Sequence, residues 1–156
     1  MGPTIKTTTT VGGKFVFKDV RDTPDTATVL YECPGYLCTY EVRHGNGKDP
    51  WGEMDHGLEF YGSKASLWIN RRGYSVFLED ARPEAIKVAD RGQDTPHKRN
   101  WLDCIRSCQR PNADVELGHL GSIPGHLANI AYRVNRRIQW DGERETIPND
   151  AEASAL

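Results

Sequence analysis

The sequence has 156 residues, which suffices for one domain but is short for a typical two-domain enzyme. Its 20 basic and 22 acidic residues give a formal net charge of −2, which argues against a nucleic-acid-binding protein with a basic surface. No apolar run approaches the roughly 18 residues of a membrane span, and the N-terminal residues lack the pattern of a signal peptide. We therefore expect a soluble, cytoplasmic protein with a single domain over residues 1–156.

The first two-thirds of the chain predicts β-strands, because apolar and polar residues alternate there in short runs. The runs cover residues 14–18, 26–32, 36–43, 58–61, 66–70 and 74–79. Short turns such as Pro34-Gly35 and Gly62-Ser63-Lys64 connect neighbouring runs, so the strands must be mainly antiparallel. A polar loop from residue 44 to residue 56, rich in Gly, Asp and Lys, separates the first three runs from the last three.

Both faces of these strands carry bulky side chains. In the second run, Val29 and Tyr31 lie on one face and Leu30 lies on the other. An antiparallel sheet with one face in water should show a cleaner polar alternation. We therefore expect an open sheet with helices packed on one face and a partner on the other, in a homodimer packed sheet to sheet.

The last third predicts two helices, which makes the fold class α+β. In the first helix, Asp94 and Pro96 suit the N-terminus and Pro111 follows the end. Its apolar stripe consists of Trp101, Leu102, Ile105 and Cys108. The second helix is expected to start near residues 122–124 and to present an apolar face of Leu127, Ile130, Ala131 and Val134. A short strand at residues 138–140 and a terminal helix from Pro148 follow.

Three arginines, Arg133, Arg136 and Arg137, cluster at the C-terminal end of the second predicted helix. Basic side chains complement the helix dipole at such an end. We interpret the cluster as a solvated helix end rather than as a nucleic-acid-binding patch.

The four cysteines form two close pairs, Cys33 with Cys38 and Cys104 with Cys108. Without an export signal, reduced thiols are the default, and their apolar neighbours favour cysteine as a small buried hydrophobic residue. A zinc site built from Cys104, Cys108, His119 and His126 is the alternative. Its spacing does not match the usual short zinc-binding patterns, so no metal is expected.

Motifs for cofactors and for catalysis are absent from the sequence. The glycines at Gly45 and Gly47 lack the third glycine and the strand–turn–helix setting of a dinucleotide-binding fingerprint. No phosphate-binding Gly-Lys-Ser/Thr string and no nucleophile elbow occur. From the motifs alone, the chain is an α+β domain without a complete active site, and no catalytic residue is assigned.

Several long strings, taken together and in order, resemble the C-terminal domain of the Gfo/Idh/MocA oxidoreductases. They are residues 12–19, 23–26, 60–64, 66–73, 97–107, 110–116, 118–119 and 126–133. The resemblance extends over nearly the whole chain, from about Pro3 to Leu156. Ala65, where the family often has glycine, and Leu120, where an arginine is common, depart from the pattern.

The resemblance implies the substrate-side and oligomerisation domain of an NAD(P)-dependent enzyme that acts on sugars or polyols. In that family a separate Rossmann domain binds the cofactor and carries a catalytic Glu-Lys-Pro motif, and the catalytic histidine lies on the helix that opens the C-terminal domain. This sequence contains no Glu-Lys-Pro string, and it is expected to begin after that helix. We therefore expect no cofactor in this chain, no activity of the chain alone, and a homo-oligomer that could pair with a separate Rossmann-domain chain.

The alternative is a standalone carbohydrate-binding or scaffold protein derived from this domain. An aromatic face with hydrogen-bonding neighbours suits a sugar, which makes Trp51 and His56 in the polar loop candidate substrate-binding residues. His119 is the third candidate, on the resemblance to the family's pocket. For each of these residues an ordinary structural role is the competing interpretation.

Overall fold

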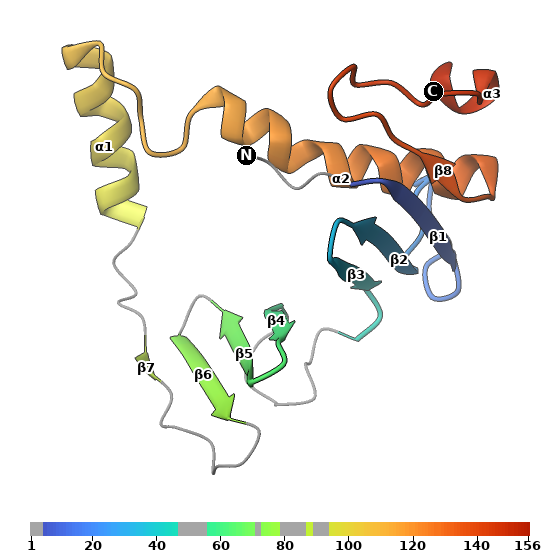
Figure 1. The fold of residues 1–156 in the computed structure, drawn as a ribbon, viewed down its shortest axis with the longest axis horizontal. Coiled ribbons are helices and arrows are strands. Elements are labelled where there is room, and N and C mark those ends of the chain that lie inside the picture. The colour runs from blue at the N-terminus through green and yellow to red at the C-terminus, as the bar shows by residue number, and fades with distance from the viewer. Residues whose placement is uncertain (1–4, 47–55, 71–72, 79–86, 89–93) are drawn as a thin grey trace. The chain divides into compact units, whose positions relative to one another are not determined.

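The computed structural model describes residues 5–46, 56–70, 73–78, 87–88 and 94–156 (Figure 1). Antiparallel strands and helices confirm the α+β class. The chain divides into two compact units, one formed by Met1–Asn46 with Ala113–Leu156 and the other by Gly47–Asn112. The strands accordingly form two four-stranded sheets, and the expectation of one domain over residues 1–156 stays a prediction.

The first unit contains a four-stranded antiparallel sheet with the strand order β3-β2-β1-β8. Its elements are β1 (Thr7–Gly13), β2 (Thr26–Cys33), β3 (Tyr36–Arg43), α2 (Val115–Val134), β8 (Ile138–Gln139) and α3 (Ala151–Ser154). The predicted strands at residues 26–32 and 36–43 are confirmed, and the turn between them contains Gly35 at a φ of 85°. The predicted closing strand and terminal helix are confirmed as β8 and α3.

The second unit contains the sheet β4-β5-β6-β7 and the helix α1. Its elements are β4 (Leu58–Tyr61), β5 (Ala65–Asn70), β6 (Gly73–Leu78), β7 (Lys87–Val88) and α1 (Asp94–Ser107). The three strands predicted in this region agree with β4, β5 and β6 to within a residue or two. The helix α1 begins at Asp94 as predicted, and Cys108 ends it with a φ of 56°.

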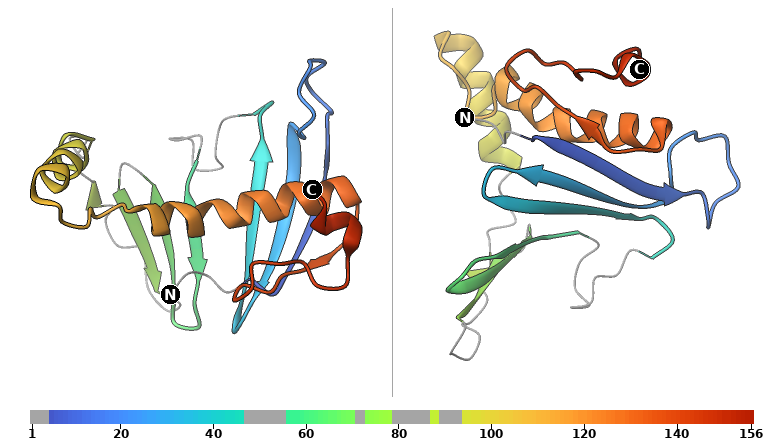
Figure 2. Two further views of the ribbon diagram at one scale, coloured as in Figure 1. Left: turned by 90° about the horizontal axis from the view of Figure 1, so that it is seen from above. Right: turned by 45° about the vertical axis from the view of Figure 1, so that its right-hand side comes forward.

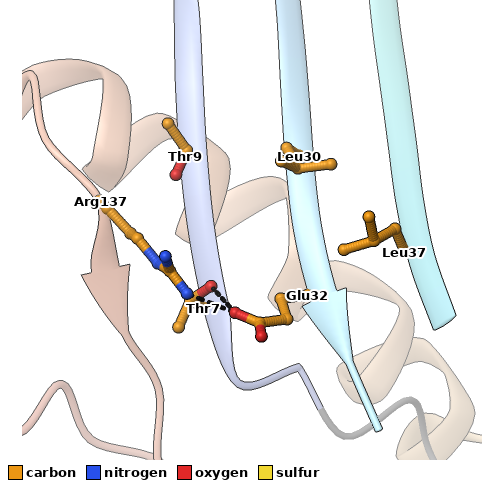
Figure 3. Close-up of a pocket in the computed structure, with 6 residues that line it drawn as sticks. All are labelled: Thr7, Thr9, Leu30, Glu32, Leu37 and Arg137. Carbon is orange, nitrogen blue, oxygen red and sulfur yellow. Dashed lines mark hydrogen bonds and ion pairs between the residues drawn. The ribbon is translucent and has the colours of Figure 1, made fainter. Parts of the chain in front are cut away.

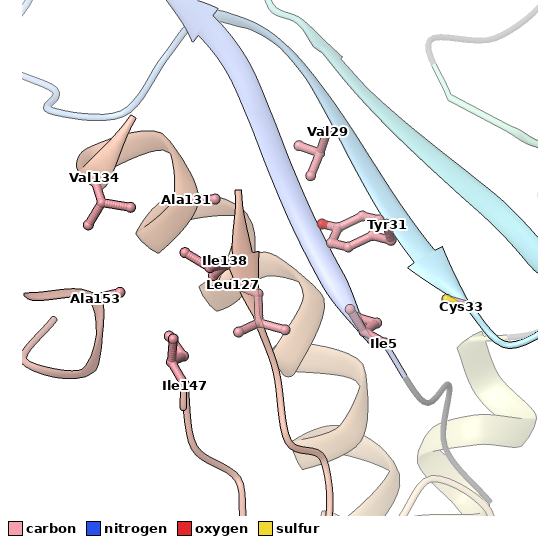
Figure 4. Close-up of a cluster of buried hydrophobic side chains, with 10 residues drawn as sticks. All are labelled: Ile5, Val29, Tyr31, Cys33, Leu127, Ala131, Val134, Ile138, Ile147 and Ala153. Carbon is pink, nitrogen blue, oxygen red and sulfur yellow. The ribbon is translucent and has the colours of Figure 1, made fainter. Parts of the chain in front are cut away.

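The core of the first unit lies between α2 and one face of its sheet (Figure 4). The predicted apolar face of the helix is confirmed, since Leu127, Ala131 and Val134 are buried and Ile130 is partly buried against them. The side chains that α2 and its neighbours bury are Ile5, Val29, Tyr31, Cys33, Ile138, Ile147 and Ala153. The helix therefore covers one face of the sheet, as expected (Figure 2).

Two hydrogen bonds fix α2 on the sheet in addition to the apolar contacts. The Tyr31 hydroxyl donates to the Pro124 carbonyl at 2.9 Å, and the Thr10 hydroxyl donates to the Ala128 carbonyl at 2.8 Å. Burial raises the pKa of Tyr31 to about 12, so this hydroxyl remains a donor at every physiological pH. Both bonds join residues about a hundred positions apart in the sequence and set the position of the helix along the strands.

Two predictions of secondary structure are wrong. Residues 14–18 form a loop rather than a strand, and the strand that precedes it, β1, was not predicted. The second helix begins at Val115 rather than near residue 122, because the Asp114 carboxylate caps it by accepting from the Leu117 amide at 2.9 Å. Pro124 lies inside this helix instead of at its start.

The prediction of buried cysteines holds only in part. Cys33 is buried, Cys104 is half-buried, and Cys38 and Cys108 are exposed. Cys38 lies on the helix-facing side of β3, opposite Tyr31, yet β3 is the edge strand and α2 packs mainly on β1 and β2. The apolar stripe of α1 is also exposed, with Trp101, Leu102 and Ile105 each between 42% and 58% accessible.

The helices of the described residues include none that is both long enough and apolar enough to cross a lipid bilayer.

We predict that Leu127→Ala destabilises the first unit by about 2–5 kcal/mol, because the substitution leaves a cavity under α2 where the side chain is 2% exposed. Urea denaturation followed by circular dichroism measures the change. The matched control is Leu117→Ala on the same helix, where the side chain is 55% exposed, and it should shift the free energy of unfolding by less than about 0.5 kcal/mol. Equal effects of the two substitutions would contradict this account of the core.

Candidate functional site: the uncovered face of the first sheet

The face of the first sheet that points away from α2 is the candidate site. Side chains alternate across a strand, so the residues between the buried ones of β1 and β2 must lie on the opposite side. We call this surface the open face. It consists of Thr7, Thr9, Val11, Thr28, Leu30, Glu32, Leu37, Thr39, Glu41, Arg43, Arg137 and Gln139.

The centre of the open face is neutral and has an apolar side chain, Leu30, which is 41% exposed. Leu37 is 67% exposed and lies opposite Glu32 toward one end of the face. Both leucines lie in regular strands whose backbones are paired. The threonines around them offer methyl groups and hydroxyls without charge. The bulk of Leu30 is one of the features from which a partner on this side was expected, and that partner stays a prediction.

The open face is hollowed at one end, with a volume of about 240 Å³ (Figure 3). The hollow is lined by Thr7, Thr9, Leu30, Glu32, Leu37 and Arg137. The Arg137 guanidinium forms an ion pair with the Glu32 carboxylate, and the Thr7 hydroxyl donates to the same carboxylate oxygen at 3.0 Å. Thr7, Glu32 and Arg137 therefore contact one another within the hollow.

The charges of the open face balance. Glu32 pairs with Arg137, and Glu41 pairs with Arg43 at 3.5 Å, so two acidic groups face two basic ones. A face of this kind does not repel a second copy of itself, whereas it offers little attraction to a strongly charged partner such as a nucleic acid.

The arginine cluster near the end of α2 contacts carboxylates rather than bulk water alone. Besides Arg137, Arg133 pairs with Asp22 at 2.6 Å, and Arg136 pairs with Asp150 at 2.7 Å. Arg136 lowers the pKa of the Asp150 carboxyl, which also caps α3 by accepting from the Ala153 amide. These arginines contact carboxylates of separate segments of the first unit, and these contacts account for them without a nucleic-acid ligand.

One edge of the open face is bordered by the loop of residues 14–25, which connects β1 to β2 and which we call the rim loop. Its base is organised by Asp25, which is 1% exposed. The Asp25 carboxylate accepts from three successive backbone amides, those of Phe15 at 3.1 Å, Val16 at 2.9 Å and Phe17 at 2.8 Å. These bonds hold the pKa of the Asp25 carboxyl well below its usual range.

The three candidate residues from the sequence do not meet in one described site. Trp51 lies outside the described residues. His56 is exposed, precedes β4 and belongs to the second unit. His119 belongs to the first unit, on α2, where its Nε2 lies 2.7 Å from the Glu145 carboxylate. His119 thus links the helix to the segment that follows β8, which is a structural role.

Among the described residues, no group of three or more His, Cys, Asp or Glu side chains could hold a metal ion. The four residues of the alternative zinc site are also divided between the two units. Cys104 and Cys108 belong to the second unit, and His119 and His126 belong to the first.

Comparisons with known proteins identify no family for this chain. No protein-family model matches the sequence, and a search of curated proteins finds no match. The likeness to the Gfo/Idh/MocA C-terminal domain therefore remains a hypothesis about the sequence strings.

Sequence reasoning missed the role of Asp25. The amides that its carboxylate binds lie eight to ten residues earlier in the chain, beyond the neighbouring backbone groups that aspartate side chains in turns usually bind, so no local signal marks this role. The side-chain pattern of Phe15, Val16 and Phe17 favours a strand. The Asp25 carboxylate, however, binds the backbone amides of these three residues, so the amides are not available to pair with a neighbouring strand.

We predict that Asp25→Asn destabilises the first unit most at neutral pH. The folded carboxyl has a lower pKa than the unfolded one, so its stabilisation is present above about pH 4, the ordinary aspartate pKa, and is lost as the pH falls further. Urea midpoints of wild type and variant between pH 3 and pH 7 should therefore converge toward the acid end.

Asp22→Asn is the control for this comparison. Asp22 is exposed and contacts Arg133 in a surface ion pair, which contributes little to stability. A difference between wild type and Asp25→Asn that stays constant from pH 3 to pH 7 would show that the charge of Asp25 is not what stabilises the loop.

Proposed function

We propose that this chain is the substrate-side and oligomerisation domain of an oxidoreductase resembling the Gfo/Idh/MocA enzymes, and that it self-associates through the open face. The observation that carries the proposal is the contrast between the two faces of the first sheet. On one face α2 buries the side chains of β1 and β2 but leaves those of the edge strand β3 exposed, and the other face exposes Leu30 and Leu37 on paired, regular strands. Exposed apolar side chains on a rigid surface are typical of an interface.

A second copy is the partner that the open face fits best. The face is electrically balanced, with Glu32 beside Arg137 and Glu41 beside Arg43. In a two-fold dimer the same patch serves both copies, so each acidic group of one copy can approach a basic group of the other. The centre then buries leucine and threonine side chains without an unpaired charge.

Two features of the first unit support the absence of a nicotinamide site from it. A dinucleotide needs a glycine-rich turn from a strand into a helix, with the helix N-terminus free for the pyrophosphate. The connection from β1 leads into another strand, and the N-terminus of α2 is occupied by the Asp114 carboxylate, which would repel a phosphate. The hydride chemistry of such an enzyme would therefore belong to a Rossmann domain, on this chain's full-length relative or on a separate chain.

A standalone carbohydrate-binding protein is the second candidate function, and the hollow of the open face favours it. The hydroxyls of Thr7 and Thr9, the Glu32 carboxylate and the Arg137 guanidinium surround two leucines, a combination that suits a sugar or polyol. Binding would have to break the contacts of Glu32 with Thr7 and Arg137. The open face cannot hold a sugar and a second copy at the same time. An experiment that detects one of the two therefore distinguishes carbohydrate binding from self-association.

We predict that the wild-type chain is a dimer at micromolar concentration and that Leu30→Glu weakens the dimer at least tenfold, because the new carboxylates would be buried without partners. Sedimentation equilibrium measures the dissociation constant. Val115→Glu is the matched control, since Val115 is 88% exposed on α2 and lies outside the open face. A wild-type chain that stays monomeric at these concentrations would overturn the proposal.

The chain alone should catalyse no hydride transfer. We expect no reduction of NAD or NADP at 340 nm with any of a panel of sugars and polyols, and no heat of binding for either nucleotide in calorimetry. Turnover by the purified chain would contradict the assignment of the cofactor site to another domain. Binding of a monosaccharide that is abolished by Glu32→Gln, in a chain that stays monomeric, would favour the carbohydrate-binding function instead.

A further inference from the structure

The rim loop exposes a group of apolar side chains at its surface. Val20 is fully exposed, Phe15 is 75% exposed and Val16 is 53% exposed. A flexible loop could fold such side chains inward, but this loop is held by its own polar contacts. The three amides bound by Asp25 fix its first half, and the Lys14 ammonium at the start of the loop donates to the Arg21 carbonyl at 2.9 Å.

The loop is further tied by Asp19, whose carboxylate pairs with Lys14 at 3.0 Å and with Arg21 at 2.5 Å. The Arg21 guanidinium in turn lies 5.3 Å from the centre of the Phe17 ring. The exposed side chains of Phe15, Val16 and Val20 therefore belong to a preformed surface. Binding a partner through this surface does not require the loop to become ordered first.

The charges of the rim loop balance within the first unit. The loop has three basic residues and three acidic ones, and its contacts pair Lys14 and Arg21 with Asp19 and pair Asp22 with Arg133 of α2. A surface of this kind lacks the positive excess that attracts nucleic acids or anionic membranes. Its apolar side chains suit a protein partner.

The rim loop continues the open face. A side chain at Gly13 would point to the same side of β1 as Thr9 and Val11, and a Cβ placed there would lie 2.7 Å from the Phe15 ring. The Phe15 ring therefore lies over the end of β1 on the side of the open face. Val11, which is 72% exposed, joins this ring to the apolar centre of the face.

We infer that the rim loop is a preformed extension of the self-association surface and that Phe15 of one copy packs against the open face of a second copy. The inference rests on the proposed function, because it takes a second copy of this chain as the partner. The neutral charge of both surfaces is compatible with this partner, and their continuity through Val11 puts the rim loop at the edge of the proposed interface. Asp25 is then a positioning residue for the interface, since it sets the backbone from which Phe15 projects.

The test compares the dissociation constants of the wild-type chain, Phe15→Ser with Val20→Ser, and the control Val115→Ser in sedimentation equilibrium. The three substituted side chains are exposed, so their removal should leave the thermal midpoint close to that of the wild type. We expect the double rim-loop variant to dissociate at least tenfold more readily than the wild type and Val115→Ser to match the wild type.

A photoreactive phenylalanine analogue at position 15 supplies a second measurement, with one copy labelled by ¹⁵N and the other unlabelled. We expect crosslinks between copies, from position 15 of one to β1, β2 or β3 of the other. Suppose that the wild type dimerises and that Leu30→Glu weakens the dimer, whereas the double rim-loop variant does not weaken it. If position 15 then also crosslinks only within its own chain, the inference is wrong and the proposed function stands. A monomeric wild type would overturn both.

Discussion

The packing of α2 on the first sheet decides which surfaces of this unit can take part in function. One helix covers one face, and the side chains of Leu127 and Ala131 fill the space above Val29 and Tyr31. Because side chains alternate along a strand, burying these residues places Leu30 and Glu32 on the opposite side. A shift of β2 by one residue would reverse the two faces, so the two long-range hydrogen bonds to α2 also fix the identity of the open face.

The rim loop depends on the same register. Asp25 directly precedes β2, and its amide donates to the Gly13 carbonyl at the end of β1, so the pairing of the two strands sets the carboxylate at the base of the loop. From there it can collect three amides from a segment whose side chains resemble those of a strand. Arg133 then ties the loop to the helix through Asp22.

Side-chain patterns predicted the parts of the fold in which one residue in two, or one stripe of a helix, is apolar. This holds for β2, β3 and the buried face of α2. The pattern failed for β1, whose threonines carry no apolar alternation and whose Thr10 is stabilised inside the core by a hydrogen bond to a helix 118 positions away. The pattern failed again at residues 14–18, where contacts with the Asp25 carboxylate rather than the side-chain pattern determine the backbone conformation. Pro124 suggested a helix start, but Asp114 caps the helix ten residues earlier, which lengthens it by more than two turns.

The same limits apply to the candidate site. The alternation along β2 predicted that Leu30 lies on the face opposite Val29 and Tyr31, because the faces of one strand can be judged from its own residues. The hollow and the rim loop join β1, β2, β3 and the residue before β8, and only the tertiary structure brings them together. The histidines were chosen by residue type and by resemblance, and His119 instead contacts Glu145 within its own unit.

The shifted pKa values of Asp25, Asp150 and Tyr31 in the first unit each have a structural cause. Perturbed pKa values often mark active sites, where several such groups converge on one cavity. Here the carboxyl groups of Asp25 and Asp150 have lowered pKa values for structural reasons, and they lie in different places. Asp25 is bound by amides of the rim loop, and Asp150 is bound by Arg136 at the cap of α3. The Tyr31 hydroxyl, whose pKa is raised by burial, lies under α2 on the opposite side of the sheet from the hollow. These interactions thus fix segments around the sheet, and the ion pairs of the open face leave that face without net charge, a property that the proposed self-association requires.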